Sequence, residues 1–450
     1  MKKKTFFACA SCGYNSAKWL GKCPSCGEFN SFSEETEEKE PLKERSHRRF
    51  DAGAVSALKD VGSIERDRIK TGIGEVDRVF GGGIVKGSLV LLGGEPGAGK
   101  STLALTIADR AAKAGIKGLY VSGEESLEQI KMRADRIGAD SEKLYVVTET
   151  GVEKIAALME SEKPGLVIID SIQTVYKEDI DSAAGGVNQV RESCAHLMYA
   201  AKKSGIPVLI VGHVTKDGSI AGPKTLEHMV DAVMYFESEN YYRFKILRAV
   251  KNRFGSTNEI GVFEMGSAGI TEVMSPSKML LENIKEQKTG SAIVTVLEGT
   301  RPMLLEIQAL TARRNFGMPQ RTVTGIDYNR VLLIIAILEK MMDLSMENQD
   351  VFMNVAGGIK VFETAADLGI AAAVYSSFRS VPLPTKWAFI GELGLDGEVR
   401  PVHMMEERVA EATRMGFAKC IIPKRSGVKT KGMEVTEIGS VEELRKIMDF

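Results

Sequence analysis

The sequence has no long hydrophobic run, few cysteines for its length and almost no net charge. Its longest apolar run, VLLIIAIL at 331–338, is well short of the roughly 18 residues that a membrane-spanning helix needs. The 6 cysteines among 450 residues are too few for a disulfide scaffold. The net charge of −1 gives no overall attraction to nucleic acid, so such binding has to come from local basic patches or from a ring of subunits.

The N-terminal stretch MKKKTFFACASCG has basic residues but no long apolar core, which argues against a signal peptide. We therefore expect a cytoplasmic protein with no membrane partner. The sequence also lacks internal repeats, and a chain of this length predicts two or three domains.

Four of the cysteines fall within the first 26 residues, as two Cys-x2-Cys pairs that are each followed by glycine: Cys9, Cys12, Cys23 and Cys26. Four thiolates in this pattern match a tetrahedral, structural Zn²⁺ site, and a redox-active dithiol pair is the alternative interpretation. We expect Phe7 and Trp19 to form a small core in this module. The remaining cysteines, Cys194 and Cys420, lie in apolar surroundings and are expected in the core.

Composition divides the chain into four segments: a zinc-binding module at 1–30, a charged linker at 31–62, a domain at 63–270 and a further domain at 276–450. Within 63–270, short apolar runs such as GSLVLLGG alternate with amphipathic helical patterns. This alternation predicts an α/β fold whose parallel sheet is covered by helices on both faces. In the last segment, paired strands and two helices predict an α+β fold.

The stretch GEPGAGKS at 94–101 is a G-x-x-x-x-G-K-S phosphate-binding loop between a predicted strand and a predicted helix. Its glycines let the backbone wrap around phosphates, and the following helix N-terminus favours negative charge. We expect Lys100 to contact the β- and γ-phosphates of ATP, and the Ser101 hydroxyl to bind Mg²⁺. The expected nucleotide-binding residues are Gly94, Glu95, Pro96, Gly97, Ala98, Gly99, Lys100, Ser101 and Thr102.

Further residues are candidates for catalysis. Asp170 ends a buried strand, the Walker B position from which a carboxylate polarises Mg²⁺ or its water; a helix cap is the alternative. Glu124 or its neighbour Glu125 follows the strand after the phosphate-loop helix. Either is placed to activate the attacking water, with Glu124 preferred, or to cap the next helix. His213 is a candidate sensor of the γ-phosphate, although a lone histidine is more often structural.

The segment TGIGEVDRVFGGGIVKGSLVLLGGEPGAGKST resembles the ATPase core of RecA- and KaiC-type proteins. KNRFG at 251–255 and the order of the domains resemble the RadA (Sms) family of bacterial DNA-repair proteins over nearly the whole chain. The resemblance implies a RecA-like P-loop ATPase in a closed, hexameric ring, with Lys251 and Arg253 reaching the neighbouring subunit's nucleotide. It also implies single-stranded and branched DNA as substrates, RecA recombinase as a partner, and branch migration in recombinational repair. A solvated turn is the alternative for KNRFG.

The last domain resembles the proteolytic domain of Lon proteases, a family that uses a serine nucleophile and a lysine base. Ala365 in FETAADLG stands where that family has the serine, and Glu406 in GEVRPVHMMEERVAEA stands where it has the lysine. Alanine cannot attack a carbonyl group, and glutamate cannot replace the lysine that activates the serine. We therefore interpret this Lon-protease-like domain as a proteolytically inactive scaffold for oligomerisation and DNA contact.

Two basic stretches are candidates for DNA contact. VTKDGSIAGPKTLEH carries Lys216 and Lys224 in a glycine-rich loop, which the RecA resemblance places at the central channel. TARRNFGMPQR clusters Arg313, Arg314 and Arg321 near an aromatic residue. Arginine beside an aromatic side chain suits a groove that follows a nucleic-acid backbone, and a solvated basic turn is the alternative.

The sequence as a whole predicts a DNA-dependent ATPase, a possible helicase, with ATP, Mg²⁺ and Zn²⁺ as cofactors. In this interpretation hydrolysis moves pore loops along single-stranded DNA, and the acidic loop at 173–189 is a second, weaker pore-loop candidate. A KaiC-like signalling ATPase and an ATP-dependent protease are the alternatives. The single ATPase copy and the zinc module argue against the first, and the missing serine and lysine argue against the second.

Overall fold

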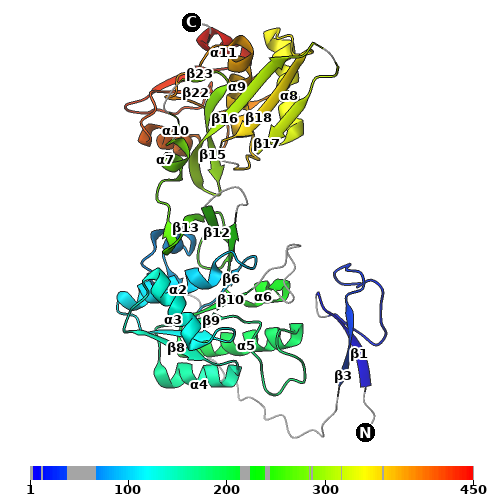
Figure 1. The fold of residues 1–450 in the computed structure, drawn as a ribbon, viewed down its shortest axis with the longest axis vertical. Helices are drawn as coiled ribbons and strands as arrows, with labels where there is room; N and C mark the ends of the chain where they lie inside the picture. Colours follow the sequence, from blue (N-terminus) through cyan, green and yellow to red (C-terminus); the bar gives the residue numbers. More distant parts are fainter. Residues whose placement is uncertain are drawn as a thin grey trace, which may run out of the picture. The chain divides into compact units, whose positions relative to one another are not determined.

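The structure of the chain is a computed structural model (Figure 1). It describes residues 4–11, 14–37, 67–212, 223–238, 244–282, 284, 287–315, 317–356 and 359–448. The chain divides into two compact units. The first comprises Met1–Ser238 and Lys245–Glu272, and the second comprises Glu239–Phe244 and Val273–Phe450.

The N-terminal module is a small antiparallel sheet in the order β2-β1-β3. Its strands are β1 (Lys4–Cys9), β2 (Asn15–Ser16) and β3 (Phe32–Glu37). Strand β3 lies in the segment that composition assigned to the linker, so the expected boundary at residue 30 is wrong. Phe32 explains the difference, because it packs with Cys9 and Cys23 in a small apolar cluster. The high charge of SEETE concealed this pairing. The rest of the predicted linker, at 38–62, lies outside the described residues.

The core of the first unit is a nine-stranded sheet in the order β14-β13-β12-β11-β6-β10-β9-β7-β8. From β11 to β8 neighbouring strands are parallel, and the β11–β12 and β13–β14 pairs are antiparallel. The parallel strands are β6 (Leu89–Gly93), β7 (Gly118–Ser122), β8 (Leu144–Thr148), β9 (Leu166–Asp170), β10 (Val208–Val211) and β11 (Ala232–Ser238). The others are β12 (Phe244–Asn252), β13 (Ile260–Gly266) and β14 (Gly269–Glu272), and a separate pair is formed by β4 (Arg68–Ile69) and β5 (Ile84–Val85).

Helices cover both faces of this sheet, as the continuous apolar strands predicted. On one face lie α1 (Gly74–Val79), α2 (Lys100–Lys113) and α3 (Leu127–Ile137), and on the other lie α4 (Val152–Glu162), α5 (Val187–Ser204) and α6 (Pro223–Met229). Strand β9 shows the alternation: Ile168 packs with Leu103 of α2, whereas Ile169 joins the cluster of Cys194 in α5. Because both faces are buried, the central strands consist almost entirely of apolar residues.

The second unit is an α+β domain around a seven-stranded mixed sheet in the order β17-β18-β16-β15-β19-β22-β23. Its strands are β15 (Ser291–Glu298), β16 (Arg301–Arg313), β17 (Arg321–Thr324), β18 (Gln349–Val355), β19 (Trp387–Phe389), β22 (Lys419–Pro423) and β23 (Glu434–Ile438). A short pair, β20 (Glu392–Leu393) and β21 (Val399–Arg400), lies apart. One face packs against α8 (Tyr328–Met342), α9 (Asp367–Arg379) and α11 (Val441–Met448), and the other against α7 (Pro276–Leu281) and α10 (Met405–Arg414).

The two lone cysteines are core residues, as expected. Cys194 lies in α5 and Cys420 in β22, each with no exposed surface, and burial raises the pKa of both thiols to about 12. Within the ranges that the structure describes, none of the helices is both long enough and apolar enough to cross a bilayer.

Candidate active site

The phosphate loop joins β6 to α2 and turns sharply at Gly99, the residue before the helix. Gly99 has a φ of 102°, in the left-handed region that favours glycine. A β-carbon at this position would lie 2.5 Å from the terminal methyl carbon of Met265 in the β13–β14 hairpin. Glycine is therefore favoured by the backbone conformation, whereas the flexible end of the Met265 side chain could move aside for a β-carbon.

Lys100, the first residue of α2, is only 3% exposed. Its ammonium group donates to the main-chain oxygens of Gly94 and Glu95, each at 2.9 Å. Burial lowers its pKa, while the carboxylates of Asp170 and Glu124 act in the opposite direction. The lysine side chain thus lies inside the phosphate loop, where the oxygen of a bound phosphate can accept the same hydrogen bonds.

Asp170 is the last residue of β9 and stands in register with Ser122 of the neighbouring parallel strand β7. The Tyr120 phenol donates to Asp170 Oδ2 at 2.6 Å, and burial raises the pKa of Tyr120, which keeps it a donor. Because both strands end at the same edge of the sheet, the chain leaving β7 brings Glu124 to the side of Asp170.

The tight path after β7 depends on Gly123. Its main-chain N–H donates to the oxygen of Asp170 at 2.9 Å. A β-carbon on Gly123 would lie 2.0 Å from Thr174 Oγ1, so any larger residue would push the chain away from β9. The hydrogen bond from Gly123 to Asp170 therefore keeps the segment that carries Glu124 close to the end of β9.

The two glutamates that follow β7 have different partners. The Ser171 hydroxyl donates to Glu124 Oε1, whereas Glu125 forms an ion pair with Arg133 of α3. Glu124 is exposed and Glu125 is half-buried. Burial raises the pKa of Glu125, and the nearby guanidinium of Arg133 lowers it again in part.

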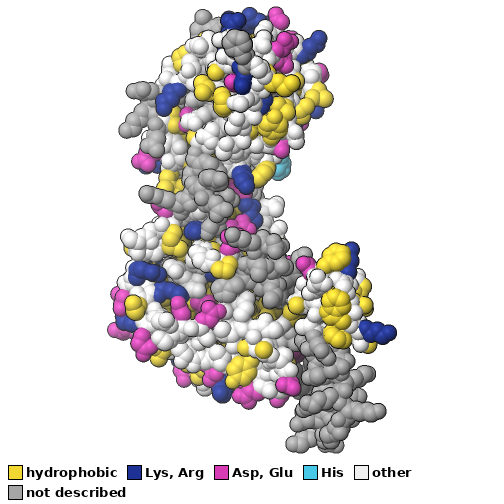
Figure 2. Space-filling view, turned by 45° about the vertical axis from the view of Figure 1, so that its right-hand side comes forward, with side chains coloured by type: hydrophobic (Ala, Val, Ile, Leu, Met, Phe, Trp, Pro, Cys, Tyr) yellow, Lys and Arg dark blue, Asp and Glu magenta, His cyan; other side chains and the backbone are white. Residues whose placement is uncertain are grey.

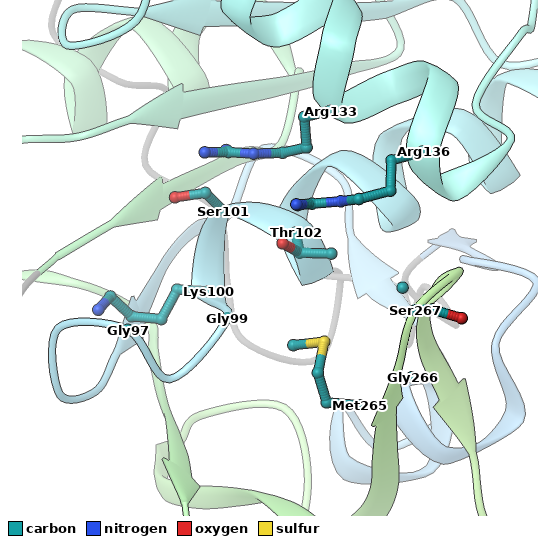
Figure 3. Close-up of a pocket in the computed structure, with 11 residues that line it drawn as sticks. Gly97, Gly99, Lys100, Ser101, Thr102, Arg133, Arg136, Met265, Gly266 and Ser267 are labelled. Carbon is teal, nitrogen blue, oxygen red and sulfur yellow. The ribbon is translucent and has the colours of Figure 1, made fainter.

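A pocket of about 570 Å³ opens over the phosphate loop, a size typical of small-molecule sites. It is lined by Gly97, Gly99, Lys100, Ser101, Thr102, Arg133, Arg136, Met265, Gly266, Ser267 and Gly269. Figure 3 shows Arg133 and Arg136 extending from α3 above Ser101 and Thr102, with Met265 on the opposite side. Sequence reasoning missed the two arginines and the hairpin. The spacing of the arginines, three residues apart on one helical face, was the available signal.

The residues present fit ATP and Mg²⁺. Ser101 and Asp170 offer a hydroxyl and a carboxylate, the oxygen ligands that Mg²⁺ prefers. Lys100 with the two arginines gives the pocket three positive charges, as a triphosphate requires. The sequence-predicted Lys100, Ser101 and Asp170 are therefore gathered at one edge of the sheet. His213 lies outside the described residues.

KNRFG forms the end of β12 and the turn after it. Lys251 donates to the main-chain oxygens of Glu227 and Val230, at 2.7 and 2.8 Å, at the end of α6. Arg253 is half exposed and pairs with buried Asp231, with 3.2 Å between Nη1 and Oδ1. Lys251 and Arg253 thus each have a partner within their own subunit. Their expected contact with the nucleotide of a neighbouring subunit stays a prediction.

The candidate DNA-binding residues lie only partly within the described ranges. Lys216 lies outside the described residues, and Lys224 belongs to α6 but its side chain is not described. Arg313 is exposed, but Arg314 pairs with Asp350 at 3.1 Å. The carboxylate of Asp350 therefore neutralises part of the positive charge of the predicted basic cluster.

Arg321 and the candidate loop at 173–189 also form hydrogen bonds within the fold. Arg321 donates to the main-chain oxygen of Met346 at 3.0 Å. The loop at 173–189 is fixed by buried Gln189, which donates to the oxygens of Ile180 and Ser182 at 2.9 and 3.0 Å.

The cysteine module brings three thiols together. The sulfur atoms of Cys9, Cys23 and Cys26 lie within 4.8 Å of one another, and Cys12 lies outside the described residues. Three converging thiols suit a tetrahedral zinc site, because cysteine thiolates are strong ligands of Zn²⁺. Phe7 packs on this cluster as expected, but Trp19 is 50% exposed, so its assignment to the core is wrong. Leu20 packs there instead, and Figure 2 shows hydrophobic side chains on the surface of the module.

Comparison with known proteins bears on each part of the chain. Residues 55–219 match the model of the AAA domain family, 7–34 match a rubredoxin metal binding domain, and 310–426 match subunit ChlI of Mg-chelatase. A DNA repair protein RadA of Bacillus subtilis is 51% identical over 448 residues, which cover 98% of both chains. The chain belongs to the RadA family of DNA repair proteins.

Other RadA proteins give the same result. Those of Halalkalibacterium halodurans and Listeria monocytogenes are 51% and 48% identical, covering 94% and 98% of this chain and 93% and 97% of their own. A KaiC-like protein of Pyrococcus horikoshii covers 46% of this chain and 99% of its own at 22% identity, with a TM-score of 0.40, which is too weak to carry an argument. The AAA-domain match and the phosphate loop between β6 and α2 give this RadA-family chain a RecA-like P-loop ATPase core. Its cofactors are ATP, Mg²⁺ and Zn²⁺.

The C-terminal domain of this RadA-family chain is Lon-like, and an ion pair between the buried Arg408 and the half-buried Glu363 lies close in sequence to Ala365 and Glu406. Ala365 is 1% exposed and Glu406 is exposed on α10. Two residues after Glu406, Arg408 is 1% exposed and bonds Glu363 in bidentate fashion, at 2.8 and 2.5 Å. Glu363 also accepts from the Leu297 N–H at 2.5 Å. Sequence reasoning singled out the missing serine and lysine but not this ion pair.

Proposed function

We propose that this chain is a DNA-dependent ATPase of recombinational repair that binds single-stranded DNA and processes branched recombination intermediates. The proposal rests on one observation above all. Lys100, Asp170 and Glu124 are assembled at the carboxyl edge of a RecA-like sheet, in a chain 51% identical to a DNA repair protein RadA. A repair enzyme of this kind acts in the cytoplasm, where bacterial DNA lies.

In this proposal Glu124 takes a proton from water while the water oxygen forms a bond to the γ-phosphorus. The bond from the γ-phosphorus to the bridging oxygen breaks, and ADP leaves with that oxygen. Lys100 binds the β- and γ-phosphate oxygens, exchanging the carbonyls of Gly94 and Glu95 for them. Ser101 and Asp170 would hold Mg²⁺, which would supply positive charge to the leaving phosphates.

We assign Glu124 as the base because of its surroundings. It accepts a hydrogen bond from the neutral hydroxyl of Ser171, and it lies close enough to Lys100 to raise the pKa of that ammonium group. Oε1 of Glu125 is already engaged by the guanidinium of Arg133, so this oxygen is occupied and less accessible to an attacking water. Glu124 is also the more exposed of the two, so water can reach it.

We propose further that the subunits form a closed, hexameric ring with RecA recombinase as a partner. Lys251 and Arg253 would act on the neighbouring subunit's nucleotide, and His213 would sense its own γ-phosphate. Lys216 and Lys224 would meet DNA in the channel, with Arg313 and Arg314 as a second contact. The Lon-like domain, which has Ala365 and Glu406 at the catalytic positions, serves as a proteolytically inactive scaffold.

The proposal is tested by binding of a fluorescent single-stranded oligonucleotide at several salt concentrations. Removal of one cation that neutralises a phosphate lowers the slope of log affinity against log salt by about 0.7. We expect Lys216→Ala to weaken binding and to flatten this slope, while Lys446→Ala on α11 changes neither. Absence of binding by the wild-type chain would refute a DNA-dependent function, and an unchanged slope in Lys216→Ala would remove this residue from the contact surface. Incubation with ATP and unfolded casein should yield no fragments.

A further inference from the structure

Arg133 occupies a position that the proposed hydrolysis does not yet use. It lies two turns into α3, whose start is fixed by a capping box between Ser126 and Gln129. Its guanidinium extends over Ser101 in the phosphate-loop pocket (Figure 3). The side chain is 19% exposed, so it is confined to the site and does not extend into solvent.

The hydrogen bonding of this guanidinium is incomplete. Nη2 pairs with Glu125 Oε1, whereas Nη1 is buried and has no hydrogen-bond partner among the described residues. Nη1 lies 3.8 Å from Asp170 Oδ2, beyond hydrogen-bond distance. Within the same described part of the chain, Glu125 Oε2 is also buried without a partner. Unfilled buried donors are costly, so the arrangement calls for an additional acceptor on the pocket side.

The charges around Arg133 indicate which acceptor fits. The carboxylates of Glu125 and Asp170 lie beside it, and Asp170 also acts on the ammonium group of Lys100. The free space of the pocket begins at Lys100 and Ser101, the residues expected at the terminal phosphates. A phosphate oxygen in that space lies within reach of both Lys100 and Nη1, and planar guanidinium donors match phosphate geometry.

We propose that Arg133 binds the terminal phosphate of the nucleotide held by its own subunit and loosens its pairing with Glu125 as it does so. The inference rests on the proposed ATPase function and adds a residue to it. Arg133 thereby distinguishes a triphosphate from a diphosphate and reports the difference to α3 through Glu125. Arg136, one turn further along α3, lines the same pocket, and its charge acts on Glu125 less than that of Arg133 does.

The test compares equilibrium binding of AMP-PNP and ADP, each with Mg²⁺, by calorimetry on the full chain. We expect Arg133→Gln to weaken AMP-PNP binding about tenfold or more, because it removes a charge-assisted bond to phosphate, and to leave ADP within about twofold. Arg133→Lys should restore part of the loss. The matched control Arg136→Gln should change the affinity for both nucleotides by the same factor.

A second variant gives a result of opposite sign. Glu125→Gln frees the guanidinium from its carboxylate, so it should tighten AMP-PNP binding relative to ADP; a purely structural ion pair predicts weaker binding of both. Equal losses for the two nucleotides in Arg133→Gln, or no loss, would overturn the inference while leaving the ATPase proposal intact. If Lys100→Ala binds AMP-PNP with the affinity of the wild type, the proposed ATPase function itself fails.

Discussion

The ammonium group of Lys251 donates a hydrogen bond to the main-chain oxygen of Val230 at 2.8 Å. With further bonds to the oxygens of Glu227 and His228, at 2.7 and 3.3 Å, it closes the C-terminal end of α6. A cation at this end also complements the helix dipole. The first residue of KNRFG therefore stabilises the subunit that carries it, in addition to any role at a neighbouring nucleotide.

Replacing Lys251 should affect stability and not only activity. We expect Lys251→Met to lower the free energy of unfolding of the first unit by about 1–3 kcal/mol, because three carbonyls lose a charged donor. Arg253→Ala is the matched comparison. Arg253 is half exposed, and its buried partner Asp231 keeps a hydrogen bond from the Leu89 N–H at 3.1 Å, so we expect a loss of no more than about 1 kcal/mol. Urea unfolding monitored by circular dichroism measures both, and equal losses would contradict the capping role.

The assignment of the base predicts unequal effects at the adjacent glutamates. Glu124→Gln should lower kcat by about 10²–10⁴-fold, since it removes the proton acceptor. Glu125→Gln should lower kcat far less, and Lys100→Ala should abolish hydrolysis. Steady-state phosphate release measures all three. A larger loss in Glu125→Gln than in Glu124→Gln would reverse the assignment.

The ion pair of the buried Arg408 in the Lon-like domain predicts a structural effect. Glu363→Ala leaves Arg408, which is 1% exposed, without its carboxylate partner, while the main-chain oxygens of Thr295 and His403 still accept from it at 2.7 and 2.9 Å. Because Glu363 is 27% exposed and these two bonds remain, we expect a loss of about 3 kcal/mol, the lower end of the cost of breaking a buried pair. The exposed neighbour on the same helix provides the control, as Glu406→Ala should change stability by less than about 0.5 kcal/mol. Thermal unfolding of the full chain tests the difference, and similar melting temperatures for the two variants would be inconsistent with it.

The cysteine module predicts a stoichiometric metal. The purified chain should contain about one Zn²⁺, and Cys23→Ala should lose it, because a structural site requires all four ligands. Cys420→Ala should retain the metal, since that thiol is buried in the core with its pKa raised to about 12. Atomic absorption measures the content. Full zinc in Cys23→Ala would show that this thiol is not a ligand.

The sequence predicted the fold where the pattern was local and repeated. The apolar strands around GSLVLLGG and GLVIID lie in the parallel part of the sheet, and the Ala-rich pattern at 364–378 forms η2 (Thr364–Ala366) and α9. Strand β3 was missed because its register depends on pairing with β1, and Phe32 is the one large apolar residue in its sequence. A pattern of charged residues predicts which positions face solvent, but it does not predict which strand a segment pairs with.

The site was predictable only in part for a related reason. Lys100, Ser101 and Asp170 stand at fixed positions relative to strand ends, so a motif locates them. Arg133 and Met265 are far apart in the sequence and meet only after α3 and the β13–β14 hairpin fold over the phosphate loop. The ion pairs of Arg314 and Arg408 also join residues distant in sequence. Such contacts decide whether a basic residue is available to a ligand, and no local pattern encodes them.

The central claim is that nucleotide turnover is coupled to a DNA strand. The most direct measurement is the ATPase rate of the purified chain with and without a single-stranded oligonucleotide, with Lys100→Ala as the background and RNA of equal length as a comparison. The account predicts a rate that rises with single-stranded DNA and saturates at the concentration where the strand is bound. A rate that stays constant whatever polynucleotide is added would contradict it.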